Sequence, residues 1–151
     1  LVFAPDGRTV YNINEIVSTV DVLQWDATAG TLTTLGSPVS ILPSGFTGTN
    51  TGAEILVSPD GRFVYASNRG DNSVAVLAVS AKDSSLTLVQ RISTGGRTPR
   101  HIALSPDGRW LLAANQDSST VNVFQRDVAT GALSATGNSI AVPHPMFILF
   151  A

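Results

Sequence analysis

Short apolar runs alternate with tight-turn segments along the whole chain. A Pro-Asp-Gly-Arg turn occurs three times, with its carboxylate at Asp6, Asp60 and Asp107. Pro sets φ for the first corner of such a turn, Asp bonds its own backbone and Gly adopts a positive φ. An apolar run lies on each side of every copy, so each copy predicts a β-hairpin. Because the Asp positions are 54 and 47 residues apart, the chain contains an internal repeat.

Aligning the three turns divides the chain into three units of four predicted strands. In the first unit the strands are expected at residues 1–4, 9–14, 19–25 and 31–35. In the second unit they are expected at 54–57, 62–68, 73–80 and 85–92. In the third unit they are expected at 100–104, 109–115, 120–125 and 132–140. No stretch has a sustained helical period, so we expect almost no helix.

The third strand of the second unit indicates how the units pack. Residues 74–79 read Val-Ala-Val-Leu-Ala-Val, so both faces of this strand are apolar. A one-sided antiparallel sheet would be polar on one face, whereas a propeller blade is covered on both. We therefore predict an all-β fold of β-propeller blades over about 1–42, 54–93 and 100–141, with an extra strand over 146–151. A β-sandwich is the alternative, but its strands would alternate more cleanly and need not repeat.

Three blades do not close a ring, which has consequences for the partners of this chain. The apolar outer faces of the first and third blades would stay exposed. The chain also begins at Leu1 inside a strand pattern and ends in another apolar run. We therefore expect a fragment, or the ordered part of a longer chain. The remaining blades would come from missing sequence, a second fragment or another copy of the chain.

Composition changes this picture mainly by excluding classes of function. Charged residues make up 13% of the chain, the formal net charge is −2 and there is no Cys. The lack of a basic patch argues against a nucleic-acid partner, and no apolar run reaches the ~20 residues of a membrane span. No residue spacing indicates a metal site or a serine-nucleophile elbow. Without Cys or a signal peptide, the default expectation for localisation is the cytoplasm.

The candidate chemistry gathers at one predicted edge of the blades, where second strands end and first strands begin. The candidates there are Asn14, Glu15, Glu54, Asn68, Arg69, Arg100, His101 and Gln116. First strands line the central channel of a propeller, so these side chains would converge at its mouth. Arg binds carboxylate or phosphate through paired hydrogen bonds, and a nearby Glu can transfer a proton. This edge therefore predicts a site for a small anionic molecule.

Each candidate also has a structural interpretation. The Asn after each second strand could occupy a left-handed or Asx-turn position. Glu15 and Arg69 could form a salt bridge between blades, Gln116 could bond within its corner, and His101 could cap a loop.

Three further features have mainly structural interpretations. His144, between two prolines, is interpreted as structural. The Asp and Arg residues of the repeated turns lie at the opposite edge, where we expect them to face solvent. The Gly/Thr/Ser-rich loop over 42–52 is either functional or a tolerated insertion.

Several of these segments resemble a known family. Residues 52–69, with Ala-Glu-Ile, Ser-Pro-Asp-Gly-Arg and Ser-Asn-Arg in that order, resemble the lactonase family of seven-bladed β-propellers. Pro-Arg-His at 99–101, Asn-Gln at 115–116, Thr-Gly-Ala-Leu at 130–133 and Val-Pro-His-Pro at 142–145 are also similar to that family. The resemblance covers nearly the whole chain and corresponds to the C-terminal half of a full member. It implies that the strand over 146–151 completes the first blade of the ring.

The resemblance also implies a function. The family includes 6-phosphogluconolactonases and fungal 3-carboxy-cis,cis-muconate lactonizing enzymes. It implies cofactor-free hydrolysis of a small anionic lactone, or cycloisomerisation of a muconate-type acid, at the channel mouth. Glu15 matches the family's general acid/base and Arg69 an anion-binding Arg.

The match to the family's catalytic residues is incomplete. Another Arg and a His of the family lie upstream of the matching region, so we expect the isolated 151 residues to be inactive. The alternative function is a non-catalytic propeller that binds a ligand or a partner protein.

Overall fold

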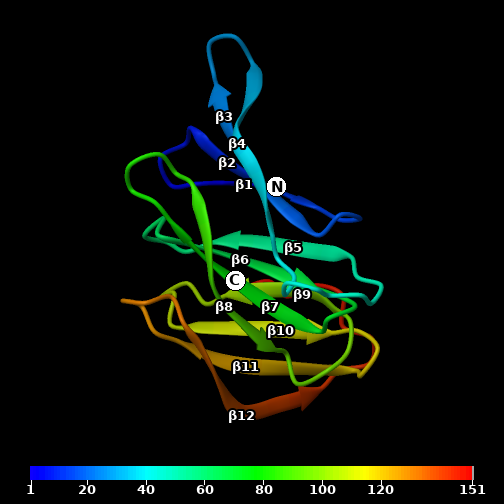
Figure 1. The fold of residues 1–151 in the computed structure, drawn as a ribbon. Helices are drawn as coiled ribbons and strands as arrows, with labels where there is room; N and C mark the ends of the chain where they lie inside the picture. Colours follow the sequence, from blue (N-terminus) through cyan, green and yellow to red (C-terminus); the bar gives the residue numbers. More distant parts are fainter. Residues whose placement is uncertain (151) are drawn as a thin grey trace.

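The computed structural model describes residues 1–150 as three four-stranded antiparallel sheets that stack beside one another (Figure 1). The first blade consists of β1 (Val2–Phe3), β2 (Thr9–Asn14), β3 (Thr19–Asp26) and β4 (Thr31–Ser40). The second consists of β5 (Gly52–Val57), β6 (Phe63–Asn68), β7 (Ser73–Val79) and β8 (Leu86–Ser93). The third consists of β9 (Pro99–Leu104), β10 (Trp110–Asn115), β11 (Thr120–Arg126) and β12 (Leu133–Ala141). Because the strands pair in chain order, the predicted all-β architecture of up-and-down blades is confirmed.

The repeated turns have the geometry that their residues dictate. Gly7, Gly61 and Gly108 all have positive φ, between 67° and 71°. Each donates its N–H to the carbonyl three residues earlier, over 2.8–3.0 Å. The preceding Asp accepts the N–H of the following Arg, as Asp6 does from Arg8 over 2.8 Å. The three hairpins predicted from Pro-Asp-Gly therefore form.

Two outer strands are longer or shifted relative to the sequence prediction because each contains a bulge. β4 was expected to end at residue 35 but continues to Ser40, and its register with β3 shifts between Val20 and Val22. Gly36, with φ of 70°, lies in this irregular part of the strand. β12 repeats the device with Gly137, whose φ is 80°. A Gly in the left-handed region lets a strand absorb an extra residue and continue.

The central blade supplies both hydrophobic cores. In β7, Ala75 and Leu77 pack toward the first blade, while Val74 and Val76 pack toward the third. All four side chains are fully buried, as a strand covered on both faces requires. The outer blades lack this second cover, so large apolar side chains are exposed there, for example those of Phe3 in β1 and Ile140 in β12.

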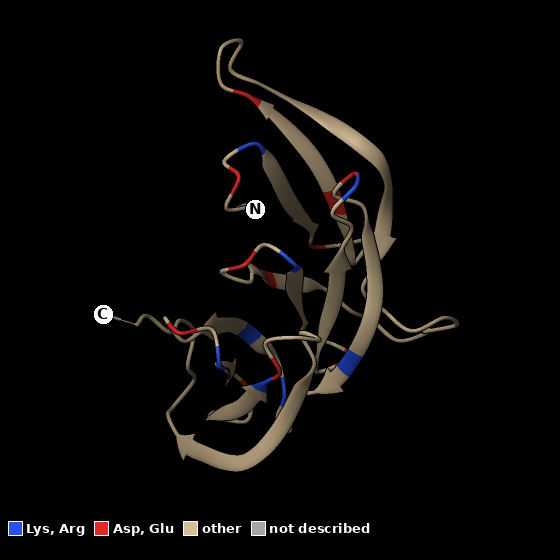
Figure 2. Cartoon of the chain, turned by 90° about the vertical axis from the view of Figure 1, so that its left-hand side faces the viewer, with Lys and Arg blue, Asp and Glu red and all other residues tan. Residues whose placement is uncertain are grey.

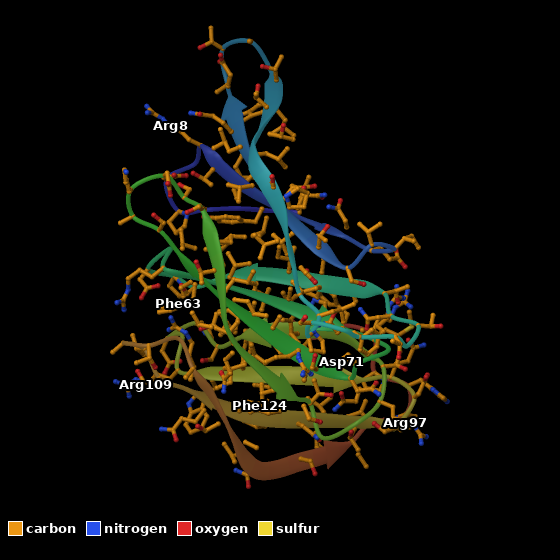
Figure 3. All side chains as sticks on the ribbon, viewed as in Figure 1. Arg8, Phe63, Asp71, Arg97, Arg109 and Phe124 are labelled. Carbon is orange, nitrogen blue, oxygen red and sulfur yellow. The ribbon has the colours of Figure 1, made fainter. Side chains whose placement is uncertain are left out.

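The connections divide between two opposite edges of the blades. One edge carries the turns that join the first strand to the second and the third to the fourth in each blade. Figure 3 shows Arg8, Phe63 and Arg109 at this edge, and Asp71 and Arg97 at the opposite edge. In the perpendicular view of Figure 2 most charged residues lie in turns and near strand ends. No helix in residues 1–150 has the length and hydropathy needed to cross a membrane.

Among the described residues, the extra strand expected over 146–151 does not form. Residues 146–150 belong to no strand, and residue 151 lies outside the described residues. The segment is instead held against the third blade, where the Ile148 N–H donates to Nδ1 of His101 over 3.3 Å.

Candidate functional site

The predicted site edge is built from the corners that follow β2 and β6. Glu15 and Arg69 take the same place in successive blades, immediately after the Asn that ends each second strand. The backbone fixes both corners, because Gly52 donates its N–H to the Glu15 carbonyl over 2.8 Å and Arg69 donates to Thr51 over 2.9 Å. The first bond joins two blades, so the positions of the two side chains are coupled.

Glu15 and Arg69 form an ion pair across the boundary between the first two blades. Nη2 of Arg69 donates to Oε1 of Glu15, and lies 3.4 Å from the Gly52 carbonyl. The Arg69 side chain is 20% exposed and that of Glu15 is 60% exposed. The inter-blade salt bridge considered from the sequence is therefore present, with the carboxylate on the solvent side of the guanidinium.

This ion pair lies in the wall of a pocket of about 260 Å³. The pocket is lined by Ile13, Glu15, Gly52, Ala53, Arg69 and Arg100. Three of the predicted site residues, one from each blade, thus come together in one cavity. Arg100 is exposed and makes no ion pair with the rest of residues 1–150. Two guanidinium groups and one carboxylate give the lining a net positive charge, which favours an anionic ligand.

Gly52 and Ile13 pack closely against each other in the wall of the pocket. A Cβ built at this position would lie 2.8 Å from Cδ1 of Ile13, which is closer than real Cβ atoms approach. Any larger residue there would push the Ile13 side chain away from its place in the pocket wall. The Nε of Arg69 is also buried without a hydrogen-bond partner within residues 1–150. Arg69 therefore retains one N–H donor without a partner, at a buried position.

Glu54 and His101 form a separate pair that does not line this pocket. Oε2 of Glu54, in β5, lies 3.3 Å from Nε2 of His101, in β9. Because Nδ1 of His101 accepts the Ile148 N–H, the proton of a neutral ring would sit on Nε2 and face Glu54. Burial lowers the pKa of His101, and the Glu54 charge opposes this only in part. The sequence grouped both residues with Glu15, whereas the structure gives them a partnership of their own.

The Asn residues that end the second strands act within the fold. None of Asn14, Asn68 and Asn115 has a positive φ, so the expected left-handed position is wrong; Ser18, Asn72 and Ser119, four residues later, have it instead. Each Asn amide reaches across its corner, to Thr19, Ser73 and Thr120 respectively.

Two predicted ligand-binding Asn residues are therefore occupied by structural bonds. Asn68 is fully buried and also donates to the Ile41 carbonyl over 2.9 Å. Asn14 donates to Oδ2 of Asp21 over 2.7 Å. Both side chains therefore join strands within the described residues, and their assignment as substrate-binding residues stays a prediction.

Gln116 and His144 lie outside the pocket. Gln116 follows β10 at the position of Glu15 and Arg69, and its backbone N–H donates to the Thr98 carbonyl over 2.9 Å. Its side chain makes no hydrogen bond within the described residues. His144 has a φ of 44°, and its N–H donates to Oγ of Ser119 over 3.3 Å.

The long loop before β5 contributes a residue that the sequence analysis missed. Oδ1 of Asn50 accepts the N–H groups of Gly70 and Asp71, each over 2.9 Å. Its Nδ2 donates to Oγ of Ser18 and to Oδ1 of Asn68. Asn50 thereby ties the corner that carries Arg69 to the first blade. One Asn in a Gly/Thr-rich loop gives no pattern from which this role could be read.

The side chains that commonly bind metals do not cluster in the part of the chain that the structure describes. No three His, Cys, Asp or Glu residues among 1–150 come together in a group able to hold a metal ion.

Comparisons with known proteins bear on the family and the fold of the chain. A family model described as "Lactonase, 7-bladed beta-propeller" matches residues 1–150. A 6-phosphogluconolactonase of Bacillus subtilis is 35% identical over 150 residues, which are 99% of this chain and 43% of that protein. The chain therefore spans less than half the length of this curated relative.

Solved structures show the same blades within longer chains. A periplasmic gluconolactonase of Pseudomonas aeruginosa, PpgL, is similar with a TM-score of 0.90 and 36% identity, covering 95% of this chain and 39% of that one. A protein from Lactobacillus plantarum is similar with a TM-score of 0.92 and 38% identity, covering 96% of this chain and 42% of that one. Both likenesses extend over nearly all of the three blades.

Proposed function

Because the chain belongs to the lactonase family of seven-bladed β-propellers, we propose that its propeller acts on a small anionic lactone at the pocket of Glu15, Arg69 and Arg100. The observation that carries the proposal is the ion pair of Glu15 and Arg69 in a cavity that Arg100 also lines. It supplies a carboxylate for proton transfer beside two anion-binding groups. The name of the B. subtilis relative supports a phosphorylated sugar lactone as the first substrate to test.

The two guanidinium groups would act mainly in binding. Arg69 and Arg100 come from different blades, so they can approach a bound carboxylate or phosphate from two sides. Arg69 is mostly buried and held by the Gly52 carbonyl as well as by Glu15, which limits the freedom it must lose on binding. Arg100 is exposed and would supply the more mobile contact. A guanidinium pair of this kind also orients the lactone relative to Glu15.

Glu15 would act in proton transfer. In hydrolysis it would accept a proton from water while the water oxygen bonds to the lactone carbonyl carbon. The ring C–O bond then breaks, and the same proton passes to the departing alkoxide oxygen to give a hydroxy acid. In cycloisomerisation of a muconate-type acid, a substrate carboxylate oxygen would bond to one alkene carbon while Glu15, in its protonated form, gives its proton to the adjacent carbon. Glu15 would then regain a proton from water. Both reactions use the same carboxylate, so product analysis must separate them.

The proposal includes completion of the ring. The relatives named above are longer than this chain, and the outer faces of the first and third blades expose large apolar side chains. We propose that further blades, from a longer chain or from another copy, cover these faces. They would also complete the wall of the channel around the pocket, so activity is expected of the intact protein and not of three blades alone.

The test is Glu15→Gln in the intact protein, assayed for hydrolysis of 6-phosphogluconolactone and for cyclisation of carboxymuconate. Gln can still accept a hydrogen bond from Arg69 but cannot transfer a proton, so turnover should fall by ~10²–10⁴-fold with little change in folding. Asp117→Asn is the matched control, because Asp117 lies at the same edge but does not line the pocket. Unchanged turnover in Glu15→Gln would remove Glu15 from the mechanism.

The same experiment decides the alternative of a non-catalytic propeller. Arg69 neutralises Glu15 in this structure, an arrangement that a pure anion-binding site could also use. Saturable binding of the anion by the unmodified intact protein, without turnover of either substrate, would favour a binding role.

A further inference from the structure

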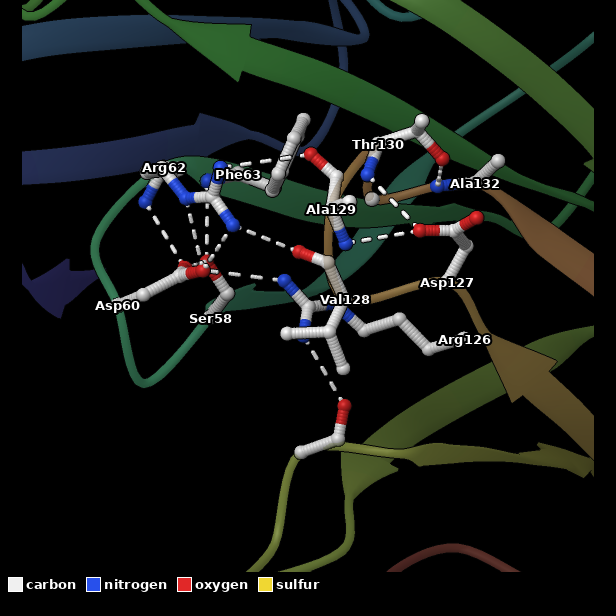
Figure 4. Close-up of polar contacts among 12 residues, drawn as sticks. Ser58, Asp60, Arg62, Phe63, Arg126, Asp127, Val128, Ala129, Thr130 and Ala132 are labelled. Carbon is white, nitrogen blue, oxygen red and sulfur yellow. Dashed lines mark hydrogen bonds and ion pairs between the residues drawn. The ribbon is translucent and has the colours of Figure 1, made fainter.

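Arg126, at the end of β11, is a buried cation that joins the second and third blades (Figure 4). Its Nε donates to the Tyr65 hydroxyl over 2.6 Å and its Nη1 donates to the Gly108 carbonyl over 3.0 Å. Nη2 lies 3.7 Å from Oδ1 of Asp60. The guanidinium also lies over the ring of Phe63, 5.6 Å from its centroid. A phenol, a carbonyl, a carboxylate and an aromatic face thus surround one guanidinium group.

The boundary between the first and second blades has counterparts of the residues that surround Arg126, but Val79 stands in place of the Arg. Val79 ends β7 as Arg126 ends β11, and each donates its N–H to the Arg of its own Pro-Asp-Gly-Arg turn, over 2.9 and 2.7 Å. By the same alignment, Tyr11 corresponds to Tyr65, Gly61 to Gly108 and Asp6 to Asp60. All the partners of the Arg126 guanidinium except the Phe ring are therefore present again.

A pocket of about 290 Å³ lies where the missing guanidinium would sit. Val79 and the three counterpart residues, Asp6, Tyr11 and Gly61, all line it. Tyr11 is 1% exposed, yet its hydroxyl makes no hydrogen bond within residues 1–150, whereas that of Tyr65 donates to Gly131 over 2.8 Å. Because Tyr11 lines the pocket, the cavity presents a hydroxyl oxygen that can accept a hydrogen bond.

The charges around the pocket favour a cation. Asp6 and Asp60 line it together with a single basic residue, Arg62. The Arg62 guanidinium is already engaged, because Nε donates to Asp60 over 2.9 Å and Nη2 donates to the Val128 carbonyl over 2.7 Å. Burial and the nearby Asp6 charge raise the pKa of Tyr11 to about 12, so its hydroxyl stays neutral and able to accept.

We propose that this pocket binds a small organic cation through a guanidinium group, placed as the Arg126 side chain is placed one blade further on. The ligand would donate to the Tyr11 hydroxyl and the Gly61 carbonyl, with its charge balanced by Asp6. The pocket is larger than a guanidinium group alone, so it also has room for a short alkyl chain. It lies at the edge opposite Glu15 and between two blades of this chain, so it depends neither on the proposed lactone chemistry nor on how the ring is completed.

The direct test is titration of the intact protein with methylguanidinium chloride, followed by calorimetry or by NMR. We expect saturable binding that Tyr11→Phe weakens by at least about tenfold, since that variant removes a hydrogen bond to a charged group. Tyr65→Phe is the matched control. It makes the same change where the Arg126 guanidinium already occupies the position, and it should leave methylguanidinium affinity unchanged. Tetramethylammonium, which has no N–H donors, should not bind.

A second variant tests whether a guanidinium group supplied by the chain itself can occupy the pocket. Val79→Arg should place its own guanidinium in the pocket, abolish methylguanidinium binding and raise the melting temperature, while Val79→Leu should do neither. Absence of saturable binding by the unmodified protein would overturn the proposal, as would equal binding of tetramethylammonium. If Val79→Arg does not fold, the comparison of Tyr11→Phe with Tyr65→Phe decides, and equal affinities in those two variants would also overturn it.

Discussion

Nε2 of His101 lies 3.3 Å from Oε2 of Glu54, and this contact joins the first strands of two neighbouring blades. The other ring nitrogen accepts the Ile148 N–H, and the Phe147 ring lies 4.3 Å from the His101 ring, centroid to centroid. The imidazole therefore links β5, β9 and the C-terminal segment. It does so in its neutral form, because a protonated Nδ1 could no longer accept from Ile148.

This arrangement predicts a pH dependence of stability. The pKa of His101 is lowered in the folded protein, chiefly by burial, from its ordinary value of 6.5. Between the lowered value and 6.5 the unfolded chain binds more protons than the folded one, so stability falls as pH decreases through that window. Urea unfolding of the intact protein at a series of pH values should show this loss, and His101→Asn should reduce it.

The matched control is His144→Asn, because His144 is exposed and has no acidic partner among the described residues. That variant should retain the pH dependence of the unmodified protein. If His101→Asn and the unmodified protein lose the same stability between neutral pH and the lower limit of the window, His101 is not the titrating group.

The fold was predictable because it rests on local residue patterns. Pro-Asp-Gly fixes each hairpin, and the two apolar faces of β7 require a sheet on each side. The ends of strands were harder to predict from the sequence, because the continuation of β4 to Ser40 depends on a bulge near Gly36. Nothing in the neighbouring sequence distinguishes a Gly that ends a strand from one that lets it continue.

The site was predictable only in part. The alignment of repeats placed Glu15, Arg69 and Arg100 at one edge, and the structure brings them into one pocket. The alignment could not show whether Glu54 lines the pocket, because successive residues of a strand face opposite sides of the sheet. The register of the strand decides which side meets the cavity. Contacts such as those of Asn50 with the next blade's corner arise from tertiary packing, so no periodic pattern marks them.

The central blade predicts where the fold is most sensitive to truncation. Leu77 is fully buried in the core between the first and second blades. Leu77→Ala should lower the free energy of unfolding by about 2–5 kcal/mol, because it loses buried contacts and leaves a cavity. Chemical denaturation with a common slope measures this difference.

Val89→Ala is the control for that measurement, since Val89 lies in β8 of the same blade but is 52% exposed. Its change should stay within about 0.5 kcal/mol. Comparable losses for the two variants would show that β7 is not the packing centre that its burial indicates.

Gly52 connects the packing of the first two blades with the shape of the candidate pocket. A Cβ at this position meets the end of the Ile13 side chain, 2.8 Å from Cδ1, and Ile13 lines the same cavity. Because a terminal methyl can move more easily than backbone, Gly52→Ala should be tolerated by the fold. The displaced Ile13 would then alter the space beside Arg69 and Glu15.

We therefore expect Gly52→Ala to lower kcat/KM for the proposed lactone substrate with only a small loss of stability. The double variant Gly52→Ala/Ile13→Ala removes the colliding Cδ1 and Cγ1 atoms of Ile13 and should recover part of the lost activity, although Ile13→Ala alone should not raise it. A double-mutant cycle on kcat/KM isolates this coupling, which is expected between residues in contact. Strictly additive effects would mean that Ile13 and Gly52 act independently and that their contact does not shape the site.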